Sequence, residues 1–371
     1  MSAPTSRSLG RRRATLTARL ATALIAALAV VCEGCSAPAP APPPLPGPSR
    51  LSLFALGDAG IPPRLHGLFS KQVAVGRGMT AEARRTPVDG IVLLGDNFYD
   101  EGLFEPELVE RVRENVVRPY CAFLALDGPR SAEVADACPV PAAERHPVPL
   151  HVVFGNHDYK SEEGPQLEIE AVPRFVPGWS VGHRPVEVRT VAPGVDLVLF
   201  DSDLLSKSGD TDPLRAALAA TRGPWRILAA HHPIAYADGE DRNPQGEEAR
   251  YTEAVRKVIL EVGLPVQLFL SGHVHNLQLL EGAAPLPGLH VIAGAGGRPK
   301  PVRYAPAHRL FAIEAPGFVR IDLAGAGGDE RLFASVFTTS SFPLLAGAQP
   351  RLEARYSVDV AGRVRNELTA P

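Results

Sequence analysis

The stretch IVLLGDNFY, residues 91–99, decides the fold, because a short apolar run of β type leads through Gly95 to the carboxylate of Asp96. The same order of apolar run and chemically active side chain occurs five times along the chain. A glycine before the active side chain lets the backbone turn sharply and approach a ligand closely. The five runs and the residues after them are 51–56 with Gly57 and Asp58, 91–94 with Gly95 and Asp96, 151–154 with Gly155, Asn156 and His157, 227–230 with His231, and 268–270 with Ser271, Gly272, His273 and His275.

Runs that are apolar on both faces are typical of central strands in a covered sheet, and open α/β sheets bind their ligands beyond the carboxyl ends of such strands. We therefore expect the five strand ends to converge on one crevice. Helical patterns between the runs predict helices over 65–85, 107–118 and 247–261. A short helix is expected after Asp212, where Pro213 suits a first turn.

After His275 the helical periodicity is weak, and strand-like segments follow near 290–293, 318–323, 331–337 and 353–360. Consecutive strands without crossover helices predict that this half of the chain forms the second sheet of a sandwich. The expected fold class is therefore α/β: a two-sheet β-sandwich flanked by helices, in four αββα layers.

Composition limits the function classes. Of the 371 residues, 45% are hydrophobic and 21% charged, which is enough apolar material for a large core and excludes global disorder. The formal net charge of −3 gives no general attraction to nucleic acid, so we expect no nucleic-acid partner and only a local site for anions.

The amino terminus has the order of an export signal, with Arg11, Arg12 and Arg13 before an apolar run at 20–31 that is too short to span a bilayer comfortably. Cleavage before Cys35 and attachment of lipid to its thiol would resemble a bacterial lipoprotein. Residues 32 and 33, Cys and Glu, depart from such sites, so plain secretion is the alternative. Twin-arginine export is a further reading of the arginine run.

These features predict three segments: an export signal at 1–35, a semi-rigid tether rich in Pro and Ala at 36–50, and a catalytic domain at 51–371. We expect an exported protein that is periplasmic, membrane-anchored through lipidated Cys35, or secreted. An oxidising compartment favours a disulfide between Cys121 and Cys138, which flank a Pro- and Ala-rich insertion; two free buried thiols are the alternative.

Each motif alone has an ordinary structural explanation. A Gly-Asp pair after a strand is commonly a turn, and His273 and His275 are either imidazoles on one face of a strand or part of a His-rich loop. Five such motifs at successive strand ends favour a shared metal site. The donors are carboxylate, amide oxygen and imidazole without cysteine, which suits two hard-ligand ions rather than structural zinc or an iron–sulfur cluster. Asp96 is the natural bridge between the two ions.

Tyr99 indicates which ions these are. A phenol has an ordinary pKa near 10, so it binds as phenolate only to an ion strong enough to displace its proton, and a trivalent ion is the best candidate. The alternative is that Tyr99 is an aromatic side chain packed beside Phe98 under the loop.

Four motifs together resemble the purple acid phosphatases, especially the small tartrate-resistant type, within the calcineurin-like metallophosphoesterases. They are Gly-Asp-Asn-Phe-Tyr at 95–99, Gly-Asn-His-Asp at 155–158, His231 two residues before Pro233, and Gly-His-Val-His-Asn-Leu-Gln at 272–278. The resemblance runs in order from about Leu51 to Gly297. The segment before Leu51 is too short for the amino-terminal domain of the large plant members, so the small form is the better comparison.

The resemblance implies a dinuclear, metal-dependent acid phosphatase, a hydrolase that cleaves small phosphate monoesters by attack of a metal-bound hydroxide. It implies Fe(III) plus a divalent ion (Fe, Zn or Mn), with His157 beside them as acid or transition-state stabiliser. The ligands it implies are Asp58, Asp96, Tyr99 and His275 for the ferric ion, and Asp96, Asn156, His231 and His273 for the divalent ion.

Two positions depart from the family pattern, the first affecting substrate preference and the second only peripheral packing. The family usually carries a further histidine beyond the His-x-Pro motif, but this loop reads Ala-Asp-Gly-Glu at 237–240, and Ala59 stands where an aromatic residue is usual. Two other functions stay open. One is a general phosphoesterase acting on diesters or nucleotides with two divalent metals, and the other is a tethered binding protein without turnover.

Overall fold

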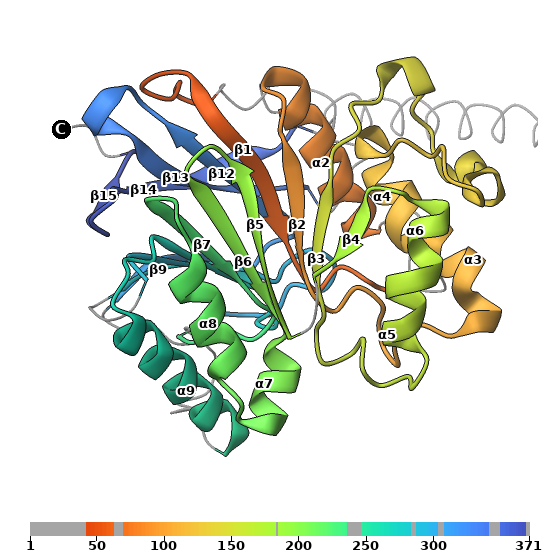
Figure 1. The fold of residues 1–371 in the computed structure, drawn as a ribbon. Coiled ribbons are helices and arrows are strands. Elements are labelled where there is room, and N and C mark those ends of the chain that lie inside the picture. Colours follow the sequence, from red (N-terminus) through yellow and green to blue (C-terminus); the bar gives the residue numbers. More distant parts are fainter. Residues whose placement is uncertain are drawn as a thin grey trace, which may run out of the picture.

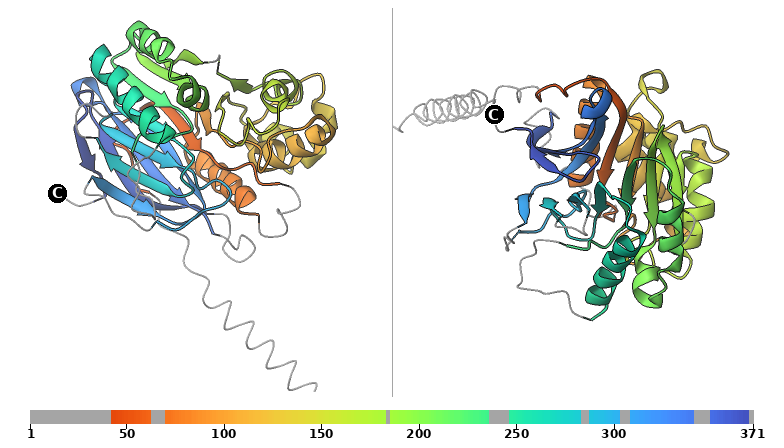
Figure 2. Two further views of the ribbon diagram at one scale, coloured as in Figure 1. Left: turned by 90° about the horizontal axis from the view of Figure 1, so that it is seen from below. Right: turned by 60° about the vertical axis from the view of Figure 1, so that its left-hand side comes forward.

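Two mixed β-sheets lie face to face at the centre of the molecule, and helices cover the outer face of each (Figure 1, Figure 2). The computed structural model describes residues 42–62, 70–182, 185–235, 246–282, 287–302, 308–340 and 349–368. This arrangement confirms the predicted αββα sandwich.

The first sheet has eight strands, of which β1, β2, β3 and the edge strand β4 run parallel. On the other side of β1 the pairing is antiparallel out to β15. In spatial order the strands are β15 (Val364–Asn366), β14 (Arg351–Val358), β13 (Arg331–Thr338), β12 (Gly317–Ala324), β1 (Ser49–Leu56), β2 (Gly90–Leu94), β3 (Leu150–Val153) and β4 (Trp179–Val181).

The second sheet has seven strands, with β6, β7, β8 and β10 parallel at its centre and antiparallel strands at both edges. In spatial order these are β11 (Arg309–Ile313), β9 (Leu277–Glu281), β10 (Leu289–Ala293), β8 (Leu268–Ser271), β7 (Trp225–Ala229), β6 (Val195–Phe200) and β5 (Val186–Ala192).

Helices form the two outer layers, and π-type turns interrupt two of the helical stretches of the first layer. The first layer holds α2 (Lys71–Arg85), a stretch made of Glu105–Glu107, α3 (Leu108–Arg111), the π-type turn Val112–Val117 and α4 (Arg118–Tyr120), and a second stretch made of α5 (Gly164–Gln166), the π-type turn Leu167–Ala171 and α6 (Val172–Phe175). The second layer holds α7 (Ser202–Ser208), α8 (Asp212–Ala220) and α9 (Glu247–Val262). Single 3-10 turns lie at Cys121–Phe123, Ser131–Glu133, Ala135–Ala137, Ala142–Glu144 and Gly327–Asp329.

Strand β1 explains why these runs are apolar on both faces. Successive side chains of a strand point to opposite sides of the sheet. Leu53 belongs to the core between the two sheets, whereas Phe54 packs outward with Val75 and Met79 of α2. A third core lies between the second sheet and its helices, where Phe269 meets residues of α8 and α9. Central strands with two buried faces therefore hold the strand-end loops on a rigid frame.

The assignment of the late strands to the second sheet was wrong in part. Strands β12 to β15 extend the first sheet beyond β1, and only β9, β10 and β11 of the region after His275 belong to the second. The five motif-bearing strands are accordingly divided, with β1, β2 and β3 in one sheet and β7 and β8 in the other. The hydrophobic pattern predicts that a segment is a strand, but which strand it pairs with depends on residues distant in the sequence.

The predicted disulfide is present between Cys121, just after α4, and Cys138. The expected signal at 1–35 and the first six tether residues lie outside the described residues, as do 65–69 of the first predicted helix. Within the segment predicted to be a tether, the Pro43 carbonyl accepts a hydrogen bond from Arg355 of β14 at 2.5 Å. Among the described helices, none combines the length and apolar character that crossing a membrane requires.

Candidate metal centre

The loops after β1, β2, β3, β7 and β8 meet at one edge of the sandwich, where the lower ends of both sheets approach each other in Figure 1. Hydrogen bonds join the loops across the sheets. The His231 Nδ1 donates to the Leu94 carbonyl at 2.8 Å, and the backbone N–H of His273 donates to the Asp58 Oδ2 at 2.8 Å. Within the first sheet the backbone N–H of Asp58 donates to the Gly95 carbonyl at 3.0 Å. The strand ends predicted to converge therefore meet through hydrogen bonds between loops of both sheets.

Three of the predicted ligands have left-handed backbone conformations, with φ of 58° at Asp58, 54° at Asp96 and 66° at His273. Non-glycine residues adopt such values rarely, and they concentrate where a functional side chain must be aimed. The close turn also needs Gly155, because a Cβ placed there would lie 2.2 Å from the Asp96 Oδ1. The strand-end pattern of small residue and ligand therefore has a steric cause.

One group of donors surrounds the Tyr99 hydroxyl. This hydroxyl donates to the Asp58 Oδ1 at 2.8 Å and lies 3.1 Å from the His275 Nε2. The His275 Nε2 is 3.4 Å from the same Asp58 oxygen. These three side chains thus present a carboxylate, a phenol and an imidazole to one point, as predicted for the first ion's ligands.

A second group surrounds the His231 Nε2. It lies 3.2 Å from the Asn156 Oδ1, 3.2 Å from the His273 Nδ1 and 3.5 Å from the Asp96 Oδ1. The two groups adjoin, since ligand atoms of Asp58, Asp96 and His231 all lie within 4.8 Å of one another. The structure therefore brings all seven predicted ligand side chains to one place.

Backbone carbonyls fix which nitrogen of two imidazoles faces the cluster. The Nδ1 of His231 donates to Leu94, and the Nδ1 of His275 donates to the Arg298 carbonyl at 2.8 Å. Because each Nδ1 carries the proton, each Nε2 offers a lone pair inward, which is the usual way in which a metal-binding imidazole is oriented.

The electrostatics of this cluster suit a cation. Burial and the nearby Asp96 raise the pKa of Asp58 well above its usual range. Burial, with the charges of Asp58 and Asp96, likewise raises the pKa of Tyr99. Burial lowers the pKa values of His231 and His275 to about 4, so both imidazoles are neutral at ordinary pH. A buried set of two carboxylates, a phenol and neutral imidazoles is the donor set that a pair of hard or borderline ions requires.

His157 lies beside this cluster and is only half-buried. Its ring centroid is 4.4 Å from that of Tyr99, and its Nδ1 donates to the Asp100 carbonyl at 2.6 Å. The backbone N–H of His157 donates to the Asp96 Oδ1 at 2.9 Å. Because the Nδ1 is used in this way, the Nε2 is the ring nitrogen that remains for contact with a molecule bound at the cluster.

Sequence reasoning missed two features of the site. His232 offers a ring nitrogen within 4.8 Å of those of His231 and His273, and its Nδ1 lies 2.9 Å from the Ser202 hydroxyl. The only sequence signal for it was the adjacent histidine. The second feature is a buried pair of acidic residues, Asp158 and Glu168, which accept hydrogen bonds from the loops after β2 and β3.

The Asp158 carboxylate is the centre of that support. It accepts the backbone N–H of Phe98 at 3.0 Å and that of Gly155 at 2.8 Å, while the Asn97 amide binds both Asp158 and Glu168. Burial and the charge of Asp96 raise the pKa of Asp158 to about 8. Asp158, the last residue of the Gly-Asn-His-Asp motif, therefore connects the loop after β3 with the turn that carries Tyr99. The motif contains this residue, but the sequence does not show its role.

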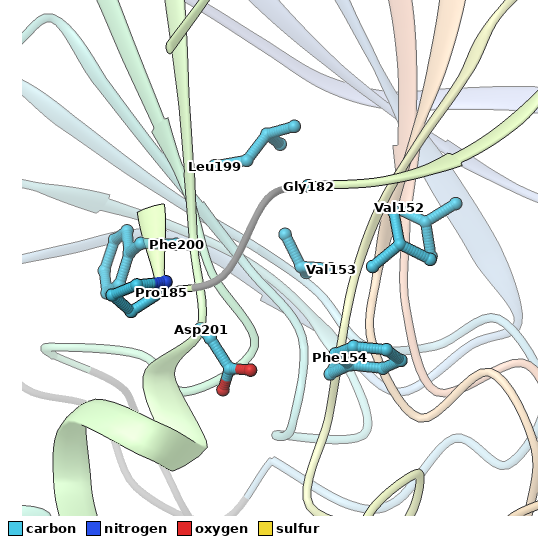
Figure 3. A pocket seen from close by; sticks show the side chains of 9 residues that line it. Val152, Val153, Phe154, Gly182, Pro185, Leu199, Phe200 and Asp201 are labelled. Carbon is cyan, nitrogen blue, oxygen red and sulfur yellow. The ribbon is translucent and has the colours of Figure 1, made fainter. Parts of the chain in front are cut away.

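A separate cavity lies between the ends of β3 and β6, lined by Val153, Phe154 and Phe200 among others (Figure 3). Among its nine lining residues, Asp201 alone is ionisable. The Asp201 carboxylate accepts the backbone N–H of Leu204 at 3.0 Å as the cap of α7 and also accepts the Tyr159 hydroxyl. This apolar cavity lacks the convergent donors of the strand-end cluster.

Comparison with known proteins agrees with this geometry. The family model described as calcineurin-like phosphoesterase matches residues 65–277, which is more than half of the chain. The tartrate-resistant acid phosphatase type 5 of Sus scrofa is 24% identical over 262 residues, covering 66% of this chain and 69% of that protein.

Solved structures share the fold at low identity. PhoD has a TM-score of 0.57 at 13% identity, covering 90% of this chain and 74% of its own. GAP50, the anchor in the inner membrane complex of Plasmodium, has a TM-score of 0.56 at 17% identity, covering 78% and 85%. Purple acid phosphatase PPD1 from yellow lupin seeds has a TM-score of 0.52 at 14% identity, covering 85% and 55%. At these identities the likeness concerns the fold alone.

Proposed function

The chain belongs to the calcineurin-like phosphoesterases, and from that premise we propose that it is an acid phosphatase that hydrolyses small phosphate monoesters at two metal ions. The observation that carries this proposal is the meeting of seven oxygen and imidazole donors from five strand-end loops. The similarity to the tartrate-resistant acid phosphatase type 5 of Sus scrofa supports the acid phosphatase part of this proposal.

The donors divide naturally into two sets that share Asp96. We assign a ferric ion to Asp58, Asp96, Tyr99 and His275, and a divalent ion (iron, zinc or manganese) to Asp96, Asn156, His231 and His273. When bound, the two ions would supply Lewis acidity toward phosphate oxygens and increase the acidity of water. Two carboxylates and one phenolate do not cancel a trivalent and a divalent charge, so the site would attract a phosphate dianion.

The chain's own contribution to turnover centres on His157. Its Nδ1 is committed to the Asp100 carbonyl, so its Nε2 is the atom that can donate to a substrate oxygen. The family's further histidine beyond the His-x-Pro motif has no counterpart at 237–240, a segment outside the described residues. We therefore assign both stabilisation of the transferred phosphoryl group and protonation of the leaving group to His157.

A binding role without turnover is the second candidate, because GAP50 is described as an anchor and shares the fold. The complete donor set favours catalysis over anchoring in this chain. A general phosphoesterase with two divalent ions and a merely packed Tyr99 is the remaining alternative, and it differs in colour and in its preference for diesters.

The test combines metal analysis, a visible spectrum and assays with an aryl phosphate monoester and the matching diester from pH 4 to pH 8. We expect two metal ions per chain, a visible tyrosinate-to-iron band, and preference for the monoester at acidic pH. Asp96→Asn should lose metal and activity, Tyr99→Phe should mainly lose the colour, and Asp329→Asn, on an exposed turn, should match the parent. A metal-loaded protein that cleaves neither ester at any pH would favour the binding role.

We also propose that the protein acts outside the cytoplasm, anchored through Cys35 or secreted. The sequence of 1–35 supports this, and the disulfide between Cys121 and Cys138 is consistent with an oxidising compartment. Mass spectrometry of the mature amino terminus tests it: a diacylglycerol on Cys35 supports the anchor, a cleaved unmodified terminus supports secretion, and an intact leader refutes both.

A further inference from the structure

We propose that Arg298 is a positioning residue whose side chain supports the loop that orients His157 and places a positive charge over Tyr99, next to the backbone contacts that orient His275. The inference rests on the proposed function, since it concerns the same two-metal site. Arg298 follows the Gly-Ala-Gly-Gly stretch at 294–297, which begins the loop after β10. No motif in the sequence singled it out.

The main chain around Arg298 binds both the side chain and the main chain of His275. Its carbonyl accepts the His275 Nδ1 proton at 2.8 Å, and two residues later the backbone N–H of Lys300 donates to the His275 carbonyl at 2.5 Å. These bonds involve backbone atoms, so the loop can orient His275 whatever side chain stands at 298.

The side chain of Arg298 acts in the other direction, toward His157. Its Nη1 donates to the Asp100 Oδ1 at 2.9 Å, in an ion pair whose side chains are 38% and 35% exposed. The carbonyl of the same Asp100 accepts the His157 Nδ1 proton. Removing the guanidinium would take away this contact with the Asp100 side chain and so weaken the support of the carbonyl that aims the His157 ring.

The guanidinium also lies over an aromatic ring. Its Cζ is 5.7 Å from the Tyr99 ring centroid, within the range of cation–π attraction. The second nearby arginine, Arg111, binds the Tyr99 carbonyl rather than covering the ring, at 2.7 Å. Arg298 is therefore the arginine that places a positive charge over the Tyr99 ring.

The geometry suits arginine better than lysine. A planar guanidinium can use one N–H group for Asp100 while its face lies toward Tyr99, whereas an ammonium has a single charged centre. Loss of such an outer contact typically lowers activity about 10- to 100-fold without removing a ligand. Loss of a positive charge over the ring makes electron transfer from phenolate to iron easier, so the visible band should move to longer wavelength.

The experiment compares Arg298→Gln and Arg298→Lys with the parent, and uses Arg351→Gln as a matched control, because Arg351 is an exposed arginine near Glu353 on β14. Each metal-loaded protein is measured for iron content, visible absorption maximum, kcat and KM with an aryl phosphate. For Arg298→Gln we expect unchanged iron content, a band at longer wavelength, and a kcat at least about tenfold lower with KM little changed. Arg298→Lys should recover the band but only part of kcat, and Arg351→Gln should match the parent.

The outcomes separate this inference from the proposed function. A parent protein with colour and activity, in which Arg298→Gln behaves like Arg351→Gln, refutes the role of Arg298 and leaves the proposed function standing. A colourless active parent refutes the ferric assignment. The role of Arg298 is then decided by comparing the kcat of Arg298→Gln with that of the parent. Iron lost in Arg298→Gln overturns the inference in favour of a structural role, and a parent with neither colour nor activity refutes both proposals.

Discussion

Gly155→Ala is the smallest change that should disable the site. A Cβ at this position would lie 2.2 Å from the Asp96 Oδ1 and 2.4 Å from the Asp96 backbone nitrogen. Ordinary contact begins near 3.4 Å, so the carboxylate has to retreat by about 1 Å. The backbone nitrogen cannot rotate away as a side chain can, and the same carboxylate oxygen already accepts the N–H of His157. The whole turn from Asp96 to His157 must therefore move.

The expected cost follows from that movement. A reacting group misplaced by about 1 Å costs about 100-fold in rate, which corresponds to about 2.7 kcal/mol of transition-state stabilisation. Forcing a methyl group into a filled space costs a further 1–3 kcal/mol or so of folding stability. Bound metal is measured by mass spectrometry. Activity is measured as kcat/KM with an aryl phosphate. Gly328→Ala is the control, because a Cβ there meets nothing within 4 Å. A Gly155→Ala protein with full metal content and kcat/KM within threefold of the parent would refute the reasoning.

Three further predictions concern other parts of the molecule. His157→Ala should keep both metals and lose about 100- to 10,000-fold in kcat, and loss of metal instead would make His157 a ligand. Replacing Cys121 and Cys138 together by serine should lower the free energy of unfolding by about 3 kcal/mol in urea titrations, because their loop is then open in the unfolded chain, and an unchanged value would contradict this. Burial lowers the pKa of His290 to about 3, so stability is lost as pH falls from about 6.5 toward 3. His290→Gln should therefore lose about 2 kcal/mol less than the parent between pH 7 and pH 5, and equal losses would be the contrary result.

The strands and ligands that the sequence predicts share one property: each is encoded locally. The run at 91–94 is apolar on both faces because β2 is covered on both, and Asp96 follows it because the strand end is where the backbone can turn. The helix expected at 247–261 is observed as α9 (Glu247–Val262), since its apolar periodicity faces a single layer.

What the sequence did not predict depends on distant partners. The hairpin of β5 and β6 was not assigned, although Gly194, with φ of 74°, marks its turn. The later strands joined β1 because β12 pairs with it in antiparallel register, and this pairing is not written in either segment alone. A local hydrophobic pattern thus indicates whether a segment is a helix or a strand more securely than it indicates which strand lies next to it.

The candidate site divides in the same way. Ligands such as Asp58 and His273 stand directly after strands and could be found from spacing. Arg298, His232 and Glu168 reach the site from loops and a helical turn whose sequence carries no repeating signal. Their contributions come from hydrogen bonds made after folding, so only the structure reveals them.

The division of the proposed ligands between the two sheets ties metal loading to the cohesion of the sandwich. Each ion would take oxygen donors from loops of β1, β2 or β3 and imidazoles from loops after β7 or β8. Stripping the ions with a chelator would then remove a cross-link between the halves of the molecule. Amide hydrogens of β2 and β8 should exchange faster together, so that metal content and sheet cohesion report on a single equilibrium.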